Sequence, residues 1–312
     1  MRKVIGVLAV IVLAVAALAL SFRGAPLAVG EIPELTPPVA APPEDMTIAV
    51  LPTGTMASVA AMAYRGGGFR DERVFGMDPV LIRHPKGDLL IDAGFGSDVD
   101  AHFETTPMLM QLTASYSAGT PVAEQLRAAG REPSSLHGIL LTHAHWDHVS
   151  GLADLPGVPV WVSAAERDFV ASDEPAAGLA HRLADDVTWR IYDFPDGPYL
   201  GFERSYDVHD DGSVVVVPAG GHTPGSVVVF VTLPDGARYA FIGDLVWQRE
   251  ALALPAERPW VSRRMVDVDD QRVRDLVVRL HRIKQALPGM IFVPAHDRRV
   301  TARLPPFAAG PE

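Results

Sequence analysis

Cysteine is absent from the 312 residues of this chain. No disulfide can therefore form, and no thiolate can bind a metal or act as a nucleophile, so any metal site has to be built from imidazole and carboxylate groups. Dense runs of Lys or Arg are also missing, and 27 basic residues stand against 38 acidic ones, for a formal net charge of −11. Contacts to phosphate supply most of the affinity of proteins for nucleic acid. The expected partner is thus a small-molecule substrate and not a nucleic acid.

The N-terminus differs from the rest of the chain. Arg2 and Lys3 precede an uncharged apolar run at residues 4–20. This pattern is typical of a signal peptide, spanning residues 1–30 and cut near Ala28-Val29-Gly30, or of an uncleaved membrane anchor. Basic residues before such a run favour a cytoplasmic N-terminus. We therefore expect an extracytoplasmic protein, periplasmic or secreted, which is tethered to a membrane through residues 4–20 if the run is not cleaved.

Residues 31–45 are rich in Pro and Ala and predict an extended, semi-rigid linker. The domain expected at residues 46–312 alternates short apolar runs with turns and helices, which indicates a layered α/β fold. The best helix is at residues 269–287, where apolar residues recur at helical spacing. Other helices are expected at 121–129 and from 164 onward. Strands are expected at 47–51, 80–83, 89–91, 138–141, 158–162, 214–217, 227–231, 239–242 and 290–293.

Four of these strands run into residue types that bind metals. The strand at 138–141 leads to His143, His145, Asp147 and His148, the strand at 214–217 to His222, the strand at 239–242 to Asp244, and the strand at 290–293 to His296. Loops at strand ends, held by a rigid sheet, are where α/β proteins place their sites. The sequence therefore predicts one site made from four loops.

The spacing of the first group has a physical reason. Residues two apart in extended backbone face the same way, so His143 and His145 can reach one ion together. Asp147 and His148 are adjacent, and a turn into a helix near Ser150 would aim them at a second ion. Zinc binds imidazole nitrogen and carboxylate oxygen readily, although Mn, Fe or Co could use the same ligands.

His143-Ala144-His145-Trp146-Asp147-His148 resembles the H-x-H-x-D-H motif of the metallo-β-lactamase superfamily. The G-H-T-P-G-S loop of that superfamily is similar to residues 221–226, and Gly243-Asp244 and Pro294-Ala295-His296 resemble its remaining ligand motifs. Residues 90–94 look like the strand and loop beside the metals, where Asp92 is expected to accept hydrogen bonds and not to bind an ion. The resemblance covers residues 47–297.

The resemblance implies an αβ/βα sandwich of two mixed β-sheets flanked by helices. It also implies two divalent metal ions, zinc first among the candidates, with a hydroxide held between them as the nucleophile. His143, His145 and His222 would hold one ion, Asp147, His148 and His296 the other, and Asp244 both. Asp147 or Asp244 would carry the proton to the leaving group, so both count as catalytic.

The motifs indicate the metal ligands but do not identify the substrate. Some β-lactamases of this fold need a metal-binding cysteine, which is absent here, and others have no carboxylate at the place of Asp244. The layout is most similar to N-acyl homoserine lactonases, which favours a small ester or lactone. A β-lactam, a thioester and a phosphodiester remain alternatives within the fold. Outside enzymes, the alternative is a metal-dependent binding module.

One residue departs from the lactonase pattern. Those enzymes carry, shortly after the bridging aspartate, a tyrosine that bonds the lactone carbonyl, and Trp247 stands in the corresponding place. An indole N–H is a donor only, so we expect Trp247 to donate to the substrate carbonyl or to form part of the wall. The other expected wall residues are Met56, Phe95, Met108-Leu109-Met110 and Trp146. The remaining histidines are read as ordinary, although His84 or His209 could line the pocket.

Overall fold

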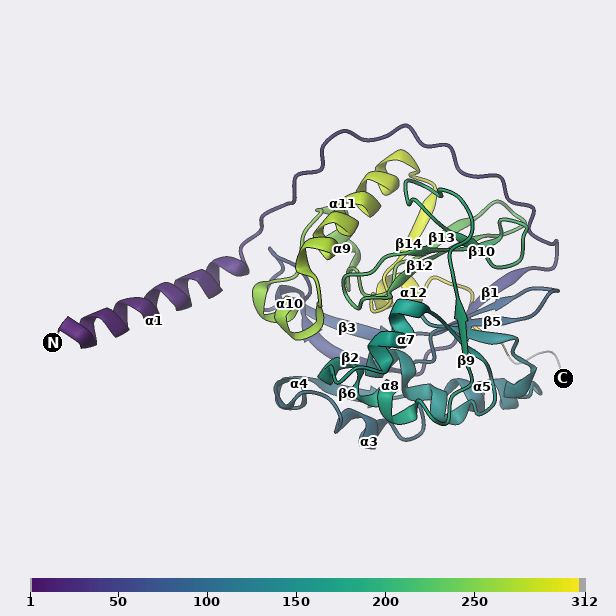
Figure 1. The fold of residues 1–312 in the computed structure, drawn as a ribbon, viewed down its shortest axis with the longest axis horizontal. Coiled ribbons are helices and arrows are strands. Elements are labelled where there is room, and N and C mark those ends of the chain that lie inside the picture. Colours follow the sequence, from purple (N-terminus) through teal and green to yellow (C-terminus); the bar gives the residue numbers. More distant parts are fainter. Residues whose placement is uncertain (1, 309–312) are drawn as a thin grey trace.

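The computed structural model describes residues 2–308, apart from the side chains of residues 2–6, 9, 109 and 113. Two larger sheets form the centre of the molecule and helices lie outside them (Figure 1). The six-stranded sheet has the order β1 (Thr47–Val50), β4 (Val80–Arg83), β5 (Leu89–Ile91), β7 (Gly138–Leu140), β8 (Val160–Ser163) and β9 (Trp189–Tyr192). The five-stranded sheet has the order β10 (Tyr206–Asp207), β11 (Val214–Pro218), β12 (Val227–Thr232), β13 (Arg238–Phe241) and β14 (Met290–Val293).

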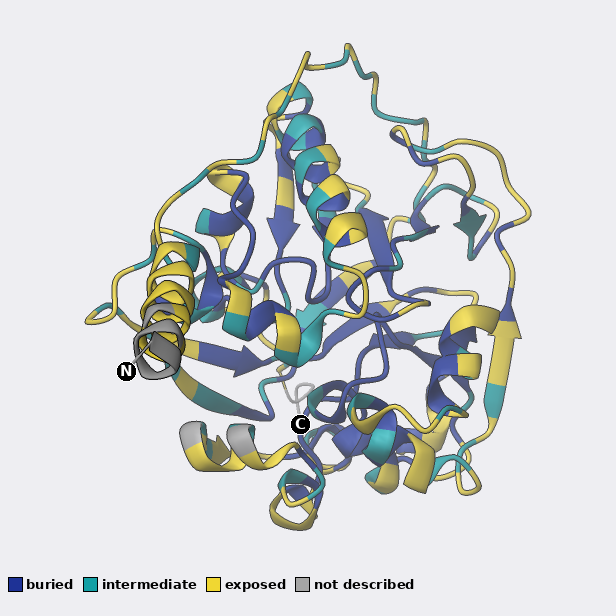
Figure 2. Ribbon diagram, turned by 60° about the vertical axis from the view of Figure 1, so that its left-hand side comes forward, coloured by how far each residue is buried: buried dark blue, intermediate teal, exposed yellow. Residues whose placement is uncertain are grey.

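Alternation along the strands explains the layers. In β4, Val80 and Ile82 belong to a buried cluster shared with Val214 and Val229 of the other sheet. Leu81, between them, belongs to a second cluster that includes buried residues of the outer helices. Successive side chains of a strand point to opposite faces, so each sheet has one face on its partner sheet and one under helices. The predicted αβ/βα sandwich is confirmed, and Figure 2 shows the buried strands inside a partly exposed outer layer.

The helices follow their apolar spacing. In α11 (Asp270–Ala286) the buried residues include Val273, Val277, Leu280 and Ile283, and the Asp269 side chain caps the first turn by accepting from two backbone amides. The helix predicted at residues 269–287 is confirmed. Further helices are α5 (Val122–Ala128), α7 (Ala164–Val170), α8 (Gly178–Leu183), α9 (Arg249–Ala253), α10 (Trp260–Val266) and α12 (Arg298–Thr301).

A third sheet was not predicted from the sequence. It is antiparallel, in the order β3 (Glu72–Met77), β2 (Gly54–Val59) and β6 (Ser115–Ala118). Most of β2 and β6 is only partly buried or exposed, so neither strand carries the continuous apolar run that marks the other strands. Short helices α2 (Ala60–Ala63), α3 (Val99–Phe103) and α4 (Met108–Thr113) accompany this sheet.

Helix α1 (Arg2–Ser21) projects from the domain (Figure 1), and its described apolar side chains are exposed, Leu13 to 69%. Within the part of the chain that the structure describes, no helix combines the length and the apolarity needed to span a bilayer. Residues 24–43 form no helix or strand and touch the domain, since the Leu27 amide donates to Pro255 O and the Ala41 amide to Asp211 O. The side chains of Arg2 and Lys3, on which the predicted orientation depends, lie outside the described residues.

Candidate metal centre

Strand directions bring the predicted residues to one place. β11 and β13 both run antiparallel to β12, and β13 is parallel to β14, so the carboxyl ends of β11, β13 and β14 lie at one edge of their sheet. Residues His222, Asp244 and His296 follow these ends. The loop after β7 meets the same edge from the other sheet, where the Val227 amide donates to Thr142 O. The site is therefore built where the two sheets meet.

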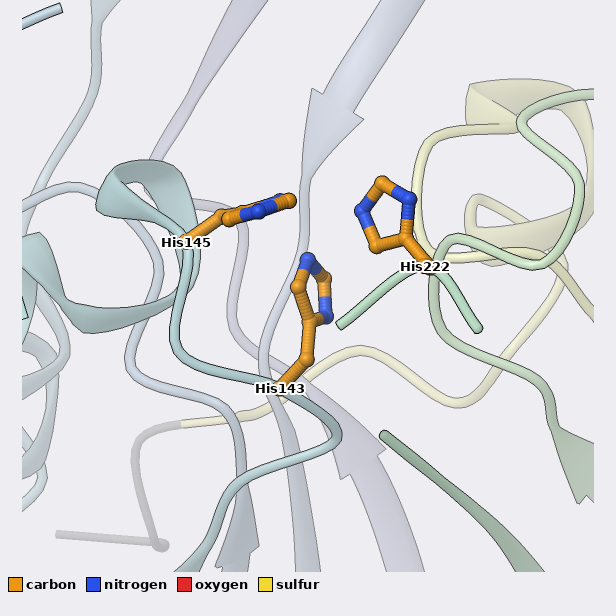
Figure 3. A group of neighbouring side chains, drawn as sticks. All are labelled: His143, His145 and His222. Atoms are coloured by element: carbon orange, nitrogen blue, oxygen red, sulfur yellow. The ribbon is translucent and has the colours of Figure 1, made fainter. Parts of the chain in front are cut away.

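Three imidazoles form the first group of potential ligands. Ligand atoms of His143, His145 and His222 lie within 4.8 Å of one another, and all three side chains are buried. Their ring centroids are 4.5–4.7 Å apart, and the rings face a common point (Figure 3). His145 has extended backbone dihedrals and comes with His143 from the loop after β7, whereas His222 comes from the loop after β11.

A second group of potential ligands contains carboxylates as well as imidazoles. Asp147, His148 and His296 form one cluster of potential ligands, and His143, His148 and Asp244 form another. A helical turn, α6 (Trp146–Val149), begins directly after His145 and orients Asp147 and His148. It starts earlier than the turn expected near Ser150.

Asp244 lies between the two groups. Its Oδ1 is 3.0 Å from His296 Nε2 and 3.4 Å from His148 Nε2, and its Oδ2 is 3.6 Å from His222 Nε2. The structure thus brings all seven predicted residues together around this carboxylate.

Unpaired buried atoms show that the site fits cations. The Nε2 atoms of His143, His145, His148 and His222, and Oδ1 of Asp244, are buried without a hydrogen-bond partner. Buried polar atoms normally have partners, and unpaired atoms that converge on one place indicate an ion-binding site. Nitrogen and carboxylate oxygen are ligands that zinc and similar divalent ions accept. The residues present therefore fit a pair of divalent metals.

The electrostatics prepare the first group to bind metal. Burial, together with the neighbouring histidines, holds the pKa of His143 and His145 well below the usual range. Both rings are thus neutral at physiological pH, which metal binding requires. Burial also lowers the pKa of His148 and His296, but the facing carboxylates outweigh it and raise both. The same histidines hold the pKa of Asp244 well below its usual range despite burial.

Hydrogen bonds fix the far side of four rings, including that of His143, whose Nδ1 lies 3.1 Å from Thr142 Oγ1. His148 Nδ1 lies 2.8 Å from Asp92 Oδ2, His222 Nδ1 lies 2.8 Å from Asp267 Oδ1, and His296 Nδ1 lies 2.9 Å from Gly76 O. Such contacts set which nitrogen faces the metal and how the ring is turned. Asp92 also accepts from the amide and hydroxyl of Thr142, at a φ of +58° that is unusual for a residue other than glycine. Its predicted role as an acceptor is confirmed.

Asp267 and Arg258 were missed by sequence reasoning. Arg258 donates to both Asp267 oxygens at 2.9 and 3.1 Å and to the backbone carbonyl of Asp244, and its guanidinium lies 4.5 Å from the centre of the Trp247 ring. Neither residue belongs to a motif that contains metal ligands, so the sequence carries no local signal for them.

Trp247 lies beside the metal centre and contacts one of the potential ligands. Its indole N–H donates to Asp244 Oδ2 at 2.7 Å. An indole has only this one donor. In this structure the N–H orients the Asp244 carboxylate, and a hydrogen bond from Trp247 to a substrate carbonyl stays a prediction. The ring itself lines the adjacent cavity, which agrees with the alternative that Trp247 forms part of the wall.

That cavity has a volume of about 420 Å³ and opens onto the metal centre. Its wall comes largely from β2, β3 and α10 and from residues 105–107 and 175–176. Among the described lining residues the only charged or titratable side chains are His145, Asp147, Asp244 and His296. Five of the nine methionines of the chain line it: Met56, Met62, Met77, Met110 and Met265. The cavity suits a neutral, apolar molecule of modest size.

The predicted wall is right in part. Met56, Met110, Trp146 and Trp247 line the cavity. Phe95 does not, because it is buried behind the wall and stacks on Trp146 at 5.2 Å. Met108 is 74% exposed and also lies outside the lining, and the side chain of Leu109 lies outside the described residues.

His84 and His209 do not line the cavity either. Their rings stack on each other at 3.8 Å, and His84 Nε2 lies 3.0 Å from Asp211.

Residues 78–296 match the family described as the metallo-beta-lactamase superfamily. The chain belongs to this superfamily, and with its His-rich metal site it is a metal-dependent hydrolase.

Among relatives, it is 29% identical over 234 residues to a probable metallo-hydrolase of Mycobacterium tuberculosis, covering 70% of this chain and 73% of that one. It is 23% identical over 185 residues to the N-acyl homoserine lactonase AttM of Agrobacterium fabrum, covering 55% and 67%. A solved N-acyl homoserine lactone hydrolase, with the product N-hexanoyl-L-homoserine at its catalytic metal centre, has a TM-score of 0.64 at 16% identity, over 83% of this chain and 96% of that one. The likeness to that structure shows the shared fold.

Proposed function

We propose that the protein is a di-zinc hydrolase that cleaves a small, uncharged ester or lactone with an apolar portion. The observation that carries this proposal is the apolar cavity that opens onto the metal centre. The similarity to AttM, a lactonase by name, supports the same choice of substrate.

In this proposal His143, His145 and His222 would hold one ion, Asp147, His148 and His296 would hold the other, and Asp244 would contribute to both. Two divalent ions would supply a Lewis acid for the substrate carbonyl and a water with its pKa lowered to about 7. Asp147 and Asp244 both line the cavity, so either carboxylate is placed to accept a proton and pass it to the leaving oxygen. The apolar walls exclude bulk water from that transfer.

Charge separates the candidate substrates. No Lys or Arg is among the described residues that line the cavity. A phosphodiester, or a β-lactam with its usual carboxylate, would enter an apolar wall without a counter-charge beyond the metals, which is unfavourable. A neutral ester or lactone has no such cost. This difference supports the ester or lactone over the β-lactam and phosphodiester alternatives.

A substrate panel tests the proposal. The purified, zinc-loaded chain is assayed with a homologous series of N-acyl lactones and simple alkyl esters, a thioester, a β-lactam and a phosphodiester. We expect turnover of lactones or esters, with kcat/KM rising about fourfold for each CH₂ group added until the cavity is full. His145→Ala should abolish turnover, whereas a binding module would show none in either form. If the phosphodiester is cleaved well and no lactone or ester is, the substrate assignment is wrong.

We also propose an extracytoplasmic location, supported by Arg2 and Lys3 before the apolar residues 4–20 and by the linker that follows. Fractionation of cells expressing the full chain tests it. We expect activity in the periplasmic, secreted or membrane fraction, and activity found wholly in the cytosol would contradict the proposal.

A further inference from the structure

Glu166 is a buried carboxylate that belongs to none of the groups of potential metal ligands. It lies in the first turn of α7, directly after β8, and is only 1% exposed. No Lys or Arg of the described residues forms an ion pair with it. A carboxylate buried without a cation is costly unless several hydrogen bonds satisfy it. The hydrogen-bond donors to the Glu166 carboxylate therefore indicate its structural role.

The partners of Glu166 lie on the two loops that carry the first three histidines. Oε1 accepts from the Ala144 amide at 2.6 Å, and Ala144 stands between His143 and His145. Oε2 accepts from the Thr223 hydroxyl at 2.8 Å and from the Gly225 amide at 2.9 Å, just beyond His222. One loop follows β7 of the six-stranded sheet and the other follows β11 of the five-stranded sheet. A single side chain thus bridges two loops of different sheets.

The backbone around Glu166 lets the His222 loop pack closely against the start of α7. A Cβ on Gly225 would lie 2.1 Å from the Glu166 backbone nitrogen, so only glycine lets the loop come so close. Ser163 caps α7 by accepting from the Glu166 amide and also donates to Gly225 O at 3.1 Å. The start of α7 is therefore fastened to the His222 loop through both backbone and side chain.

We propose that Glu166 is a positioning residue that sets the separation of His143 and His145 from His222, and so the affinity of the first metal site. The three Nε2 atoms can share an ion only if both loops keep their distance and orientation. Within the described residues, Glu166 is the side chain that hydrogen-bonds to both loops without being a potential ligand. This inference rests on the metal assignment proposed above, but not on the choice of substrate.

The decisive variant is Glu166→Gln in the full chain. Glutamine has the same shape, but its amide NH₂ in place of Oε2 would face the Gly225 N–H, donor against donor. Removal of a group that orients a metal ligand typically lowers metal affinity about 10–100-fold. We expect that loss at one of the two sites, measured by competition of the stripped protein with a chromophoric chelator for Zn²⁺. The absorption spectrum of the Co²⁺-loaded variant should change as well, because it reports the geometry of the ligands.

Two further variants complete the test. Asp88→Asn removes a carboxylate that accepts from the His84 amide and pairs with Arg131, but touches neither loop. It should leave metal affinity and the Co²⁺ spectrum unchanged, even if it lowers thermal stability. Thr223→Val removes one contact of Glu166 and should weaken metal binding several-fold. It serves as the test if Glu166→Gln does not fold. Wild-type affinity and spectrum in a folded Glu166→Gln variant, or in Thr223→Val where the former does not fold, would overturn the inference. Failure of every lactone or ester in the substrate panel would not bear on it.

Discussion

At the scale of a residue, Trp247 connects the cavity wall with the metal centre through one hydrogen bond. Trp247→Phe keeps a ring that can pack against Phe75, which lies 5.8 Å away, but removes the donor to Asp244 Oδ2. We expect kcat to fall about tenfold, because the carboxylate loses its orientation, while KM for an apolar substrate changes little. Trp247→Ala should raise KM as well. Steady-state kinetics on protein of known metal content measure both, and wild-type kcat in Trp247→Phe would contradict the orienting role.

The carboxyl of Glu166 gives the metal-free protein a particular pH dependence. Burial raises its pKa to about 7, although hydrogen bonds from Thr223, Ala144 and Gly225 act in the opposite direction. A carboxyl whose folded pKa is raised contributes stability that is present below its unfolded pKa and is lost as pH rises through 7.

Between pH 4 and pH 8, metal-free wild type should therefore lose about 3 kcal/mol of unfolding free energy relative to Glu166→Gln. Urea unfolding of both proteins across this range, with chelator present, gives that difference. A difference that stays constant with pH would show that folding does not shift the pKa of the Glu166 carboxyl.

At the scale of an element, the segment between α10 and α11 holds His222 in place. Asp267, at the end of α10, bonds the far nitrogen of His222 and pairs with buried Arg258. Asp267→Asn leaves the Arg258 charge without its partner and weakens the hold on the ring, so metal affinity should fall about 10–100-fold. Asp275→Asn is the matched control, since Asp275 is exposed on α11 and bonds only Gln271 among the described residues. Equal metal affinity in both variants would contradict the role of Asp267.

Elements also show how far the sequence predicts this structure. The strands at β4, β5 and β14 were predicted with the observed ends, because buried strands read as apolar runs bounded by turns. The ligand loops were predicted because they follow such strands and resemble the metal-binding motifs of the superfamily. The sheet of β2, β3 and β6 was not, because its strands are largely half-exposed or line a cavity and so lack that signature. Contacts between distant segments, such as that of Glu166 with Gly225, depend on tertiary packing and leave no local pattern.

At the scale of the whole molecule, the proposed ligands come from loops of both sheets, so bound ions would connect the two halves of the sandwich. We predict two ions per chain, since seven ligands exceed what one four-coordinate zinc accepts. A ligand present at 100 times its Kd stabilises the folded state by about 2.7 kcal/mol. Removal of the metals should therefore lower Tm by at least about 5 °C. Elemental analysis and thermal unfolding with and without chelator check this, and a stoichiometry near one that zinc does not raise would count against it.

The five methionines of the cavity wall bear on selectivity. Thioether side chains are unbranched and polarisable, and they rearrange around ligands of different shape more readily than branched or aromatic side chains do. Such a lining discriminates against charge more strongly than against length or branching. If the proposed function holds, tolerance for neutral substrates of varied structure would follow from the plasticity of these side chains. The same chemistry exposes the protein to oxidants, because each sulfoxide would place a polar, less adaptable group in an apolar recognition surface.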